Sequence, residues 1–302
     1  MNSTYLSAYQ VFSKSITVKD IAEPIEVHVP PYVSIEDFNQ RYMFYGDIPY
    51  IVSDDYKTYG VIHFDDESLQ TPNIGIVADI AKPILVEELI SESLPVINLP
   101  DLFTESNFYY VLSGVQITHI IRFDDLNSLP MKACIFTLFM ELETNFQRIL
   151  ARQSDEDYES LFCKLPAKRL EQINRLYNEK LINKKNKKAP YGENIFNGKN
   201  LIGENENDFK NQLSCTNFSD KKEMVKNLPE IFYQLPFTSK TEYDKFFFNV
   251  QDMRNRIAHS DSIIDYPHDP QKFSFFIQKL RQVVDIVSNL EKEEAVDFLE
   301  LI

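Results

Sequence analysis

Residues 254–259 read Arg-Asn-Arg-Ile-Ala-His and bring together side chains that could break a phosphodiester bond without a metal. Arg254 keeps its positive charge at physiological pH, His259 is of a type that titrates near neutrality, and Asn255 offers neutral hydrogen-bonding groups. Such a set can supply general acid–base catalysis and a fixed cation for charge that develops on phosphate. The alternative role of His259 is to complement the helix dipole at a C-terminus.

Helical geometry sets a condition on this candidate site. Residues 255 and 259 lie one turn apart and share a face of an ideal helix, whereas residues 254 and 259 diverge by about 140°. Arg254 and His259 therefore converge only if the helix frays or bends, or if they meet across a boundary between two subunits. Arg256 could contact the backbone of a substrate, and its alternative is an ordinary surface ion pair.

Length and composition limit the class of protein. The chain has 302 residues, which is long for one core and indicates two domains of roughly 150 residues each. With 43% hydrophobic residues, 25% charged residues and no long apolar run, we expect a globular protein without a membrane span or a secretory signal. The three cysteines form no Cys-x-x-Cys pair, which argues against a disulfide framework or a zinc site and favours a cytoplasmic location.

Charge is distributed unevenly along the chain. The formal net charge is −15, and residues 1–130 hold 19 of the 46 acidic residues but only 6 of the 31 basic ones. Since a uniformly acidic surface repels a polyanion, nucleic acid would have to bind the second half. A basic stretch there either lies near nucleic acid or forms a solvated helix face and loop. It comprises Lys164, Lys168, Arg169, Arg175, Lys180, Lys184, Lys185, Lys187 and Lys188.

An internal repeat organises residues 17–130. Residues 18–27 (VKDIAEPIEV) return 59 positions later as residues 77–86 (VADIAKPILV), with seven of the ten positions identical. The repeat predicts two copies of one supersecondary unit, copy one at about 17–70 and copy two at about 76–130. Each copy is expected to carry two β-rich runs and a short helix after its Asp-Asp pair, with a further short helix after Ser34 in copy one. The β-rich runs cover residues 48–53, 60–64, 108–113 and 117–123.

This pattern resembles a tandem pair of cystathionine-β-synthase (CBS) domains, small βαββα modules that pack in pairs and commonly bind adenosine nucleotides between the copies. The resemblance rests on the repeated Asp-Ile-Ala-x-Pro and on residues 60–66 (GVIHFDD). It implies that Asp66 and Asp125 contact ribose hydroxyls. His63 and Arg122 stand where the family carries a hydroxyl residue, and Arg122 could pair with a phosphate. The alternative role of both aspartates is helix capping.

Beyond residue 130 the hydrophobic period changes from two to 3.6 residues. Helices are predicted from about residue 131, at 156–183, at 219–234 with Ser219 as N-cap, at 239–259 and at 269–290, with a polar insertion at 184–208. The fold class is therefore α+β, an N-terminal α/β repeat pair followed by an all-α bundle. The predicted buried stripes are Ile135, Leu138, Phe139, Leu142, Phe146, Ile149 and Leu150; Phe246, Val250, Met253 and Ile257; and Phe273, Phe276, Ile277, Leu280, Val283, Val284 and Val287.

A helical bundle whose penultimate helix ends in Arg-Asn-x-x-x-His resembles the HEPN superfamily (higher eukaryotes and prokaryotes nucleotide-binding), here over residues 131–302. Its ribonuclease members carry an Arg-x(4–6)-His signature, which Arg254, Asn255 and His259 match, and Glu143 resembles an acidic position on the first helix. The resemblance implies that two protomers face each other across one composite cleft. His259 would act as general base or acid, Arg254 would stabilise charge on phosphate, and Asn255 would orient the histidine or the phosphate.

Together the two resemblances imply a nucleotide-regulated, metal-independent endoribonuclease that works as a homodimer in stress, toxin or anti-phage defence. RNA would be the substrate, no cofactor would be required, and the effector would be an adenine nucleotide or a cyclic oligonucleotide. Two alternatives stay open. One is a non-catalytic HEPN module that holds RNA or a protein on a CBS scaffold, and the other is a metabolic sensor whose output is protein contact.

Overall fold

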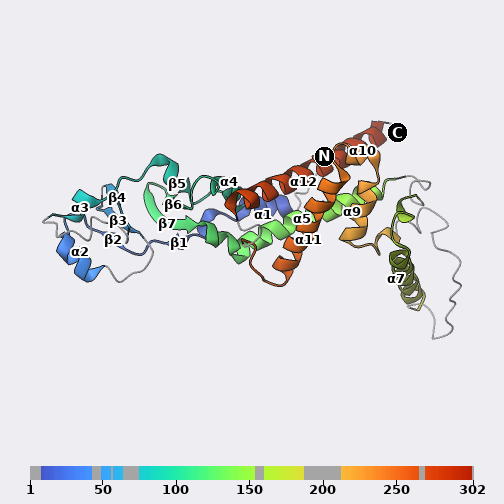
Figure 1. Ribbon diagram of the computed structural model, residues 1–302, viewed down its shortest axis with the longest axis horizontal. Helices are drawn as coiled ribbons and strands as arrows, with labels where there is room; N and C mark the ends of the chain where they lie inside the picture. Colours follow the sequence, from blue (N-terminus) through green and yellow to red (C-terminus); the bar gives the residue numbers. More distant parts are fainter. Residues whose placement is uncertain are drawn as a thin grey trace. The chain divides into compact units, whose positions relative to one another are not determined.

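The computed structural model shows a small sheet region followed along the chain by helices (Figure 1). The fold is therefore mixed α and β, as the change of hydrophobic period at residue 130 predicts. None of the helices that the structure describes combines the length and the apolar character needed to cross a lipid bilayer. The described residues are 8–42, 49–55, 57–63, 75–153, 160–186, 212–264 and 269–300, and of 181–186 and 291–300 only the backbone is described.

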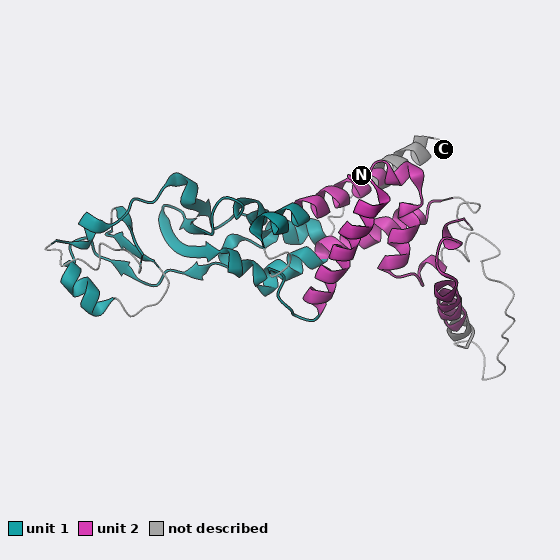
Figure 2. Cartoon of the chain, in the orientation of Figure 1, with its two compact units in different colours: residues 1–136, 259–277 teal, residues 137–258, 278–302 magenta. Residues whose placement is uncertain are grey.

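The chain forms two compact units (Figure 2). Unit 1 consists of residues 1–136 and 259–277, and unit 2 of residues 137–258 and 278–302. Unit 1 thus reaches past residue 130 and takes in residues 259–277, which the helical periodicity assigned to the second half. The CBS and HEPN identities of the two parts stay predictions.

Two contacts with residues 123–127 hold residues 259–277 within unit 1. The backbone N–H of Ile263 donates a hydrogen bond to Asn127 Oδ1 at 3.0 Å. The rings of Phe123 and Phe273 meet edge to face, with centroids 6.0 Å apart. Periodicity indicates which residues of a helix are apolar, but it does not say which neighbour that apolar face contacts, so this assignment needed the tertiary structure.

Unit 1 contains two sheets of the same design. The first has the order β2 (His28–Val29), β3 (Tyr50–Ser53) and β4 (Thr58–Ile62), with α2 (Ile35–Arg41) between β2 and β3. The second has the order β5 (Leu89–Ser91), β6 (Phe108–Ser113) and β7 (Gln116–Arg122), followed by β1 (Glu23–Pro24) as a fourth strand beside β7, with α4 (Leu99–Leu102) between β5 and β6 along the chain. In both sheets the first strand pair is parallel and the second is antiparallel.

The strand registers repeat at the offset of 59 residues. Tyr50 pairs with Ile62 in the first sheet, and Tyr109 pairs with Ile121 in the second. Each hairpin also carries a register shift at the equivalent place, between residues 52 and 53 in copy one and between residues 111 and 112 in copy two. Because a β-bulge re-aims every side chain beyond it, its repetition means that both copies direct matching residues to matching faces. The repeated sequence thus corresponds to the same strand pairing at the same offset.

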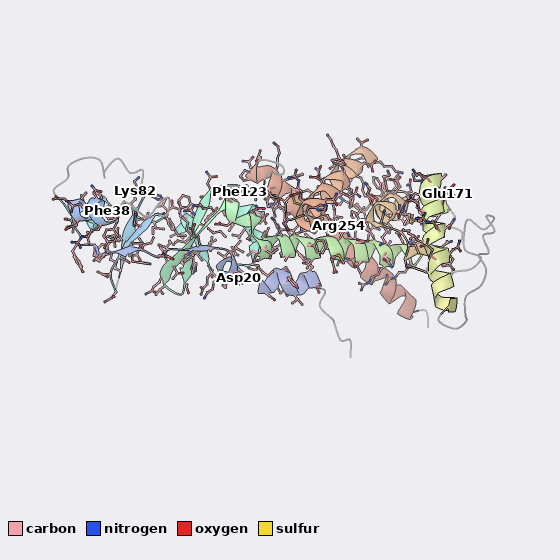
Figure 3. All side chains as sticks on the ribbon, turned by 90° about the horizontal axis from the view of Figure 1, so that it is seen from below. Asp20, Phe38, Lys82, Phe123, Glu171 and Arg254 are labelled. Atoms are coloured by element: carbon pink, nitrogen blue, oxygen red, sulfur yellow. The ribbon has the colours of Figure 1, made fainter. Side chains whose placement is uncertain are left out.

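The two copies exchange their leading segments. Glu23 of β1 (Glu23–Pro24), which belongs to copy one, pairs with Ile120 on the last strand of copy two. Lys82, the equivalent of Glu23 in copy two, pairs with Val61 on the last strand of copy one (Lys82 is labelled in Figure 3). One apolar core spans the exchange and draws residues from both copies. That core contains Ile25, Ile51, Val61, Tyr110, Ile117 and Ile120.

The repeated Asp-Ile-Ala motif starts a short helical turn in each copy. Asp20 in η1 (Val18–Asp20) accepts the backbone N–H of Thr17 at 2.7 Å. Asp79 in α3 (Val77–Ile80) accepts the backbone N–H of Ile76 at 3.2 Å. These carboxylates satisfy amide groups that a helix N-terminus otherwise leaves unpaired, which explains why aspartate recurs in the motif. The other short elements are α1 (Ala8–Ser15), η3 (Val86–Glu88), η4 (Val96–Asn98) and η5 (Phe123–Asn127).

The helices of the second half follow the predicted periodicity. The long ones are α5 (Leu129–Leu150), α7 (Ala167–Asn186), α11 (Lys240–Ala258) and α12 (Pro270–Glu300), joined by the shorter α9 (Phe218–Lys226) and α10 (Pro229–Phe232). Every residue of the stripes predicted for α5 and α12 is buried, as are Phe246, Val250 and Met253 of α11. Ile257 is only partly buried, because it lies in the last turn of α11, where less of the protein covers the helix.

Three details of the helical prediction are wrong. The helix predicted at 156–183 is interrupted by a turn at residues 163–166, and α7 begins only at Ala167. Asn217, not Ser219, caps α9, since its side chain accepts the backbone N–H of Asp220 at 3.0 Å. The helix predicted at 219–234 is broken in two, because Pro229 disfavours helical backbone at Leu228 and then starts α10 at its first position. Residues 154–159 and 187–211, including most of the predicted insertion at 184–208, lie outside the described residues.

An ion pair between α11 and α12 gives unit 2 a pH-dependent contact. The hydrogen bond from Lys279, and then those from Thr238, lower the pKa of Glu242 to about 2. A carboxyl group whose pKa is lower in the folded protein than in the unfolded chain stabilises the fold above pH 4.5. That contribution to the free energy of unfolding is lost as the pH falls toward 2 and the group becomes protonated. We therefore expect Glu242→Gln to lower the free energy of unfolding at pH 7, and this difference from wild type to vanish between pH 4.5 and 2. Urea unfolding across that range tests it, with the exposed Glu171→Gln as control.

Candidate functional site

Helix α11 places two residues of the Arg-Asn-x-x-x-His signature near its accessible end. Its apolar side chains Phe246, Val250 and Met253 are buried in unit 2, while Asn255 is exposed and the Arg254 side chain keeps 35% of its surface accessible. The polar residues therefore lie away from the buried stripe, as the spacing predicts. They are accessible to solvent.

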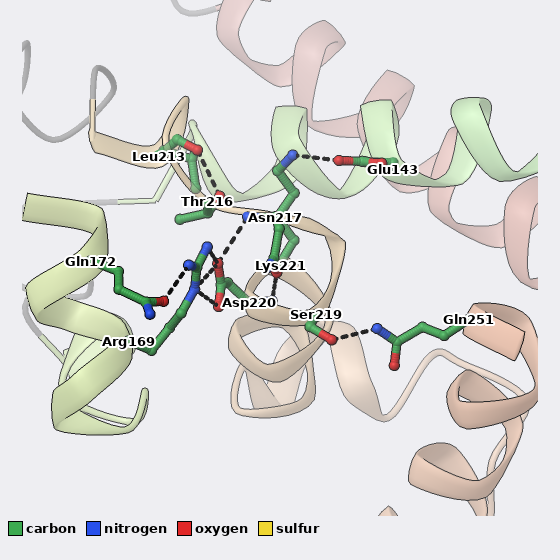
Figure 4. Close-up of polar contacts among 10 residues, drawn as sticks. All are labelled: Glu143, Arg169, Gln172, Leu213, Thr216, Asn217, Ser219, Asp220, Lys221 and Gln251. Carbon is green, nitrogen blue, oxygen red and sulfur yellow. Dashed lines mark hydrogen bonds and ion pairs between the residues drawn. The ribbon is translucent and has the colours of Figure 1, made fainter. Parts of the chain in front are cut away.

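Glu143 on α5, the acidic position singled out on the first long helix, contacts Arg254. Glu143 Oε2 lies 3.3 Å from a terminal nitrogen of Arg254. Its other carboxylate oxygen, Oε1, accepts a hydrogen bond at 2.9 Å from Lys221 of α9 (Figure 4). One carboxylate thus joins two cations from two other helices, and we call these three residues the charge cluster.

Lys221 is a residue that sequence reasoning missed. Its side chain is only 5% exposed, and it lies on the stripe of α9 that also buries Phe218, Met224 and Val225. A lysine at a position where helical spacing requires an apolar residue is the signal that could have identified it. A buried lysine is retained only with a partner, and that partner is Glu143.

The first turn of α9 is anchored on its other side by Asp220. The guanidinium of Arg169 on α7 donates to both carboxylate oxygens of Asp220, at 2.9 Å and 2.7 Å. Asp220 also accepts the backbone N–H of Asn217 at 2.8 Å, which closes the capping box (Figure 4). Two-point arginine–carboxylate pairs fix orientation as well as distance. Asp220 of α9 therefore contacts α7 and its neighbour Lys221 contacts α5. Together these contacts fix the position of Lys221.

His259 follows α11 directly. The helix ends at Ala258, and Ser260 adopts a φ of 61°, which ends the helical path. The side chain of His259 is exposed. Arg254 and Asn255 belong to unit 2, whereas His259 is the first residue of the second segment of unit 1. The divergence of 140° expected on a regular helix therefore does not apply to His259, which lies past the last helical residue.

Arg256 and the basic stretch take mostly local roles. Arg256 donates to Asp252 at 2.9 Å, the surface ion pair that was its alternative. Arg175 pairs with Glu179 at 3.7 Å, and Lys180 donates to the carbonyl of Ser214 at 3.1 Å. Lys164 and Lys168 are exposed, and the side chains of Lys184, Lys185, Lys187 and Lys188 lie outside the described part.

The residues predicted to bind a nucleotide in unit 1 are engaged within the protein. Arg122 pairs with Glu23 at 2.5 Å, across the exchange between the two copies. His63 Nε2 lies 3.1 Å from the hydroxyl of Tyr110, also across the two copies. Asp66 falls outside the described residues. A ligand that needs Arg122 must therefore compete with Glu23.

Asp125 caps the helical turn η5. Its carboxylate accepts the backbone N–H of Arg122 at 2.7 Å, and burial raises the pKa of this carboxyl against the lowering effect of that hydrogen bond. Asp125 is therefore a helix cap, the alternative role given for it above, and its contact with a ribose stays a prediction. Asp125→Ala should lower the free energy of unfolding by about 1 kcal/mol through loss of the cap. Urea unfolding measures this loss. As a control, Asp124→Ala at the exposed neighbouring position should change the free energy of unfolding by less than about 0.5 kcal/mol.

A shallow pocket of about 350 Å³ in unit 1 is lined by residues 103–107 and 269–271, none of which belongs to the predicted site. Within the described ranges, no three His, Cys, Asp or Glu side chains lie close enough together to hold a metal ion.

Comparison with known proteins adds no relative. No protein-family model matches the chain, and no curated protein sequence matches it significantly.

Proposed function

We propose that the protein is a metal-independent endoribonuclease under nucleotide control, with a role in stress, toxin or anti-phage defence in the cytoplasm. The observation that supports it is the polarity of α11. This helix buries its apolar stripe and leaves Arg254, Asn255 and the adjoining His259 accessible. A cation and an amide near the end of α11, and an imidazole on the residue that follows the helix, are thereby each accessible for chemistry on a phosphodiester.

The chemistry needs only these groups and the RNA itself. A base removes the proton from a ribose 2′-hydroxyl, the 2′-oxygen attacks the adjacent phosphorus, and the bond to the 5′-oxygen breaks as an acid donates a proton to it. His259 supplies the base or the acid, Arg254 stabilises the charge that builds up on phosphate, and Asn255 orients the histidine or the phosphate. The products are a 2′,3′-cyclic phosphate and a 5′-hydroxyl. A homodimer with a composite cleft provides one histidine for each proton transfer.

Control by a nucleotide is proposed for unit 1. Its intertwined repeat places side chains of both copies side by side, as the pairs Arg122–Glu23 and His63–Tyr110 illustrate. An adenine nucleotide or cyclic oligonucleotide that prefers one arrangement of the copies would shift the protein toward that arrangement. Thermal-shift screening with AMP, ATP, S-adenosylmethionine and cyclic oligonucleotides tests this, because a ligand of the native state raises the melting temperature.

The activity is tested with end-labelled RNA in buffer that contains excess EDTA. We expect cleavage to persist and the new ends to be cyclic phosphates, which resist phosphatase until acid opens the ring. Dependence on a divalent cation, or products with a 5′-phosphate, would show a different mechanism. A complete absence of cleavage, with and without the nucleotides above, would remove the enzyme from consideration.

A non-catalytic RNA- or protein-binding module is the second candidate. One observation favours it: among the described residues, no hydrogen bond to the His259 side chain is recorded that would select a tautomer, and a working general base is usually oriented in that way. Binding of RNA without cleavage distinguishes this candidate. A third candidate, a sensor that signals through protein contact, predicts a stabilising nucleotide and no RNA binding.

A further inference from the structure

Two cations share one carboxylate in the charge cluster. Glu143 offers Oε1 to Lys221 and Oε2 to Arg254, so each oxygen serves a different partner. The cluster carries a net charge of +1 when all three groups are ionised, in a chain whose formal net charge is −15. A local excess of positive charge on an acidic protein attracts an anion to that place.

The three members of the cluster differ in accessibility. Lys221 is 5% exposed, Glu143 is 22% exposed and Arg254 is 35% exposed. A ligand therefore meets Arg254 first and does not reach Lys221. The guanidinium has five N–H donors, and the recorded ion pair occupies one terminal nitrogen at 3.3 Å. Arg254 is thus the group that would touch an anion, and the excess charge behind it comes from Lys221.

We propose that the charge cluster binds a backbone phosphate of RNA through Arg254, and that Lys221 is a positioning residue that keeps Arg254 available. This inference rests on the proposed ribonuclease function for the identity of the ligand. Lys221 draws Oε1 of Glu143 toward itself at 2.9 Å, and a terminal nitrogen of Arg254 meets the other oxygen, Oε2, at 3.3 Å, which is longer than the contacts of a two-point arginine–carboxylate pair. Without Lys221, both oxygens turn to Arg254, and the pair becomes neutral.

Two contacts keep Arg254 directed as the proposal requires. Its guanidinium lies over the ring of Phe218, with the central carbon 6.0 Å from the ring centroid. Phe218 and Lys221 belong to the same turn of α9, which the pair of Asp220 with Arg169 anchors. One short helix thus supplies the aromatic platform for Arg254 and the counter-cation for Glu143.

The test measures binding of a fluorescent RNA oligonucleotide that is 2′-O-methylated throughout and cannot be cleaved. Lys221→Met should weaken binding roughly 10- to 100-fold, as expected for loss of a charge-assisted contact to phosphate. Lys221→Met combined with Glu143→Gln should restore binding to within about 3-fold of wild type, because the carboxylate that captures Arg254 is removed as well. If Lys221 had only a structural role, removing Glu143 as well would not restore RNA binding. Inorganic phosphate should displace the oligonucleotide only at much higher concentration, since it offers a single contact.

A matched control lies on the same helix. Lys226 is 14% exposed and pairs with Glu223 at 2.6 Å and with Asp244 at 3.1 Å, so Lys226→Met also removes a partly buried lysine of α9 without touching Glu143. Its binding should equal that of wild type. If Lys221→Met unfolds the protein, the double variant tests the inference instead. It folds because it leaves no buried unpaired charge, and the inference requires it to bind RNA like wild type.

The outcomes separate this inference from the proposed function. If the wild type binds RNA without cleaving it, the ribonuclease proposal is wrong. The phosphate site is still supported in that case when Lys221→Met weakens binding and the double variant restores it. No binding by the wild type, unchanged binding by Lys221→Met, or a double variant as weak as the single one would each overturn the inference.

Discussion

His259→Ala should lower the rate of RNA cleavage about 10²- to 10⁴-fold, the usual contribution of a positioned general acid or base. The physical reason is that alanine has no group that accepts or donates a proton near neutral pH. Stability should hardly change, since His259 is exposed and lies past the last residue of α11. The measurement is the single-turnover rate on labelled RNA, with the unfolding midpoint recorded for each protein.

His28→Ala is the matched control for this prediction. His28 is also exposed, its Nδ1 lies 2.9 Å from the Ser53 hydroxyl in the first sheet, and it has no part in the proposed chemistry. Its cleavage rate should equal that of wild type. Equal rates for wild type and His259→Ala would eliminate catalysis by this residue and leave the binding module as the remaining reading of the signature.

Gly60→Ala should lower the free energy of unfolding by about 2–4 kcal/mol, the cost of forcing an atom into a closed space. A Cβ on Gly60 would lie 2.3 Å from the carbonyl oxygen of Lys82, which is backbone and cannot rotate away. That carbonyl accepts the N–H of Val61 at 2.8 Å, and Val61 accepts the N–H of Lys82 at 2.9 Å. The extra methyl group therefore separates the strands where copy two adds to copy one.

Hydrogen exchange of the Val61 and Lys82 amides gives a local measurement of this effect, alongside urea unfolding. Both amides should exchange faster in Gly60→Ala, because the bridge between the copies opens more often. Gly114→Ala is the control, since its φ of 62° costs alanine about 1 kcal/mol while nothing lies within 4 Å of the added carbon. Unchanged protection at Val61 would contradict the close packing of the exchanged segments.

Much of the candidate site could be predicted, and one part could not. The spacing of apolar residues indicated that α11 would bury Val250 and Met253 and leave Asn255 exposed, because a helix repeats every 3.6 residues whatever surrounds it. A resemblance singled out Glu143, and the structure shows its contact with Arg254. Lys221 escaped notice because its role depends on a carboxylate 78 residues away. Helical spacing could have marked Lys221 as a lysine on a buried stripe, but only folding decides which carboxylate it meets.

What the amino-acid sequence determined by itself is the set of regular elements and the repetition of one unit at a spacing of 59 residues. Propensity, capping and periodicity act between near neighbours, so they can be read from the chain. Only the tertiary structure decided that Glu23 and Lys82 add to the opposite copies, that residues 259–277 belong with the sheets, and that one carboxylate divides itself between Lys221 and Arg254. These choices are made between segments distant in sequence, where the burial of shared apolar surface and the pairing of buried charges select one partner among many.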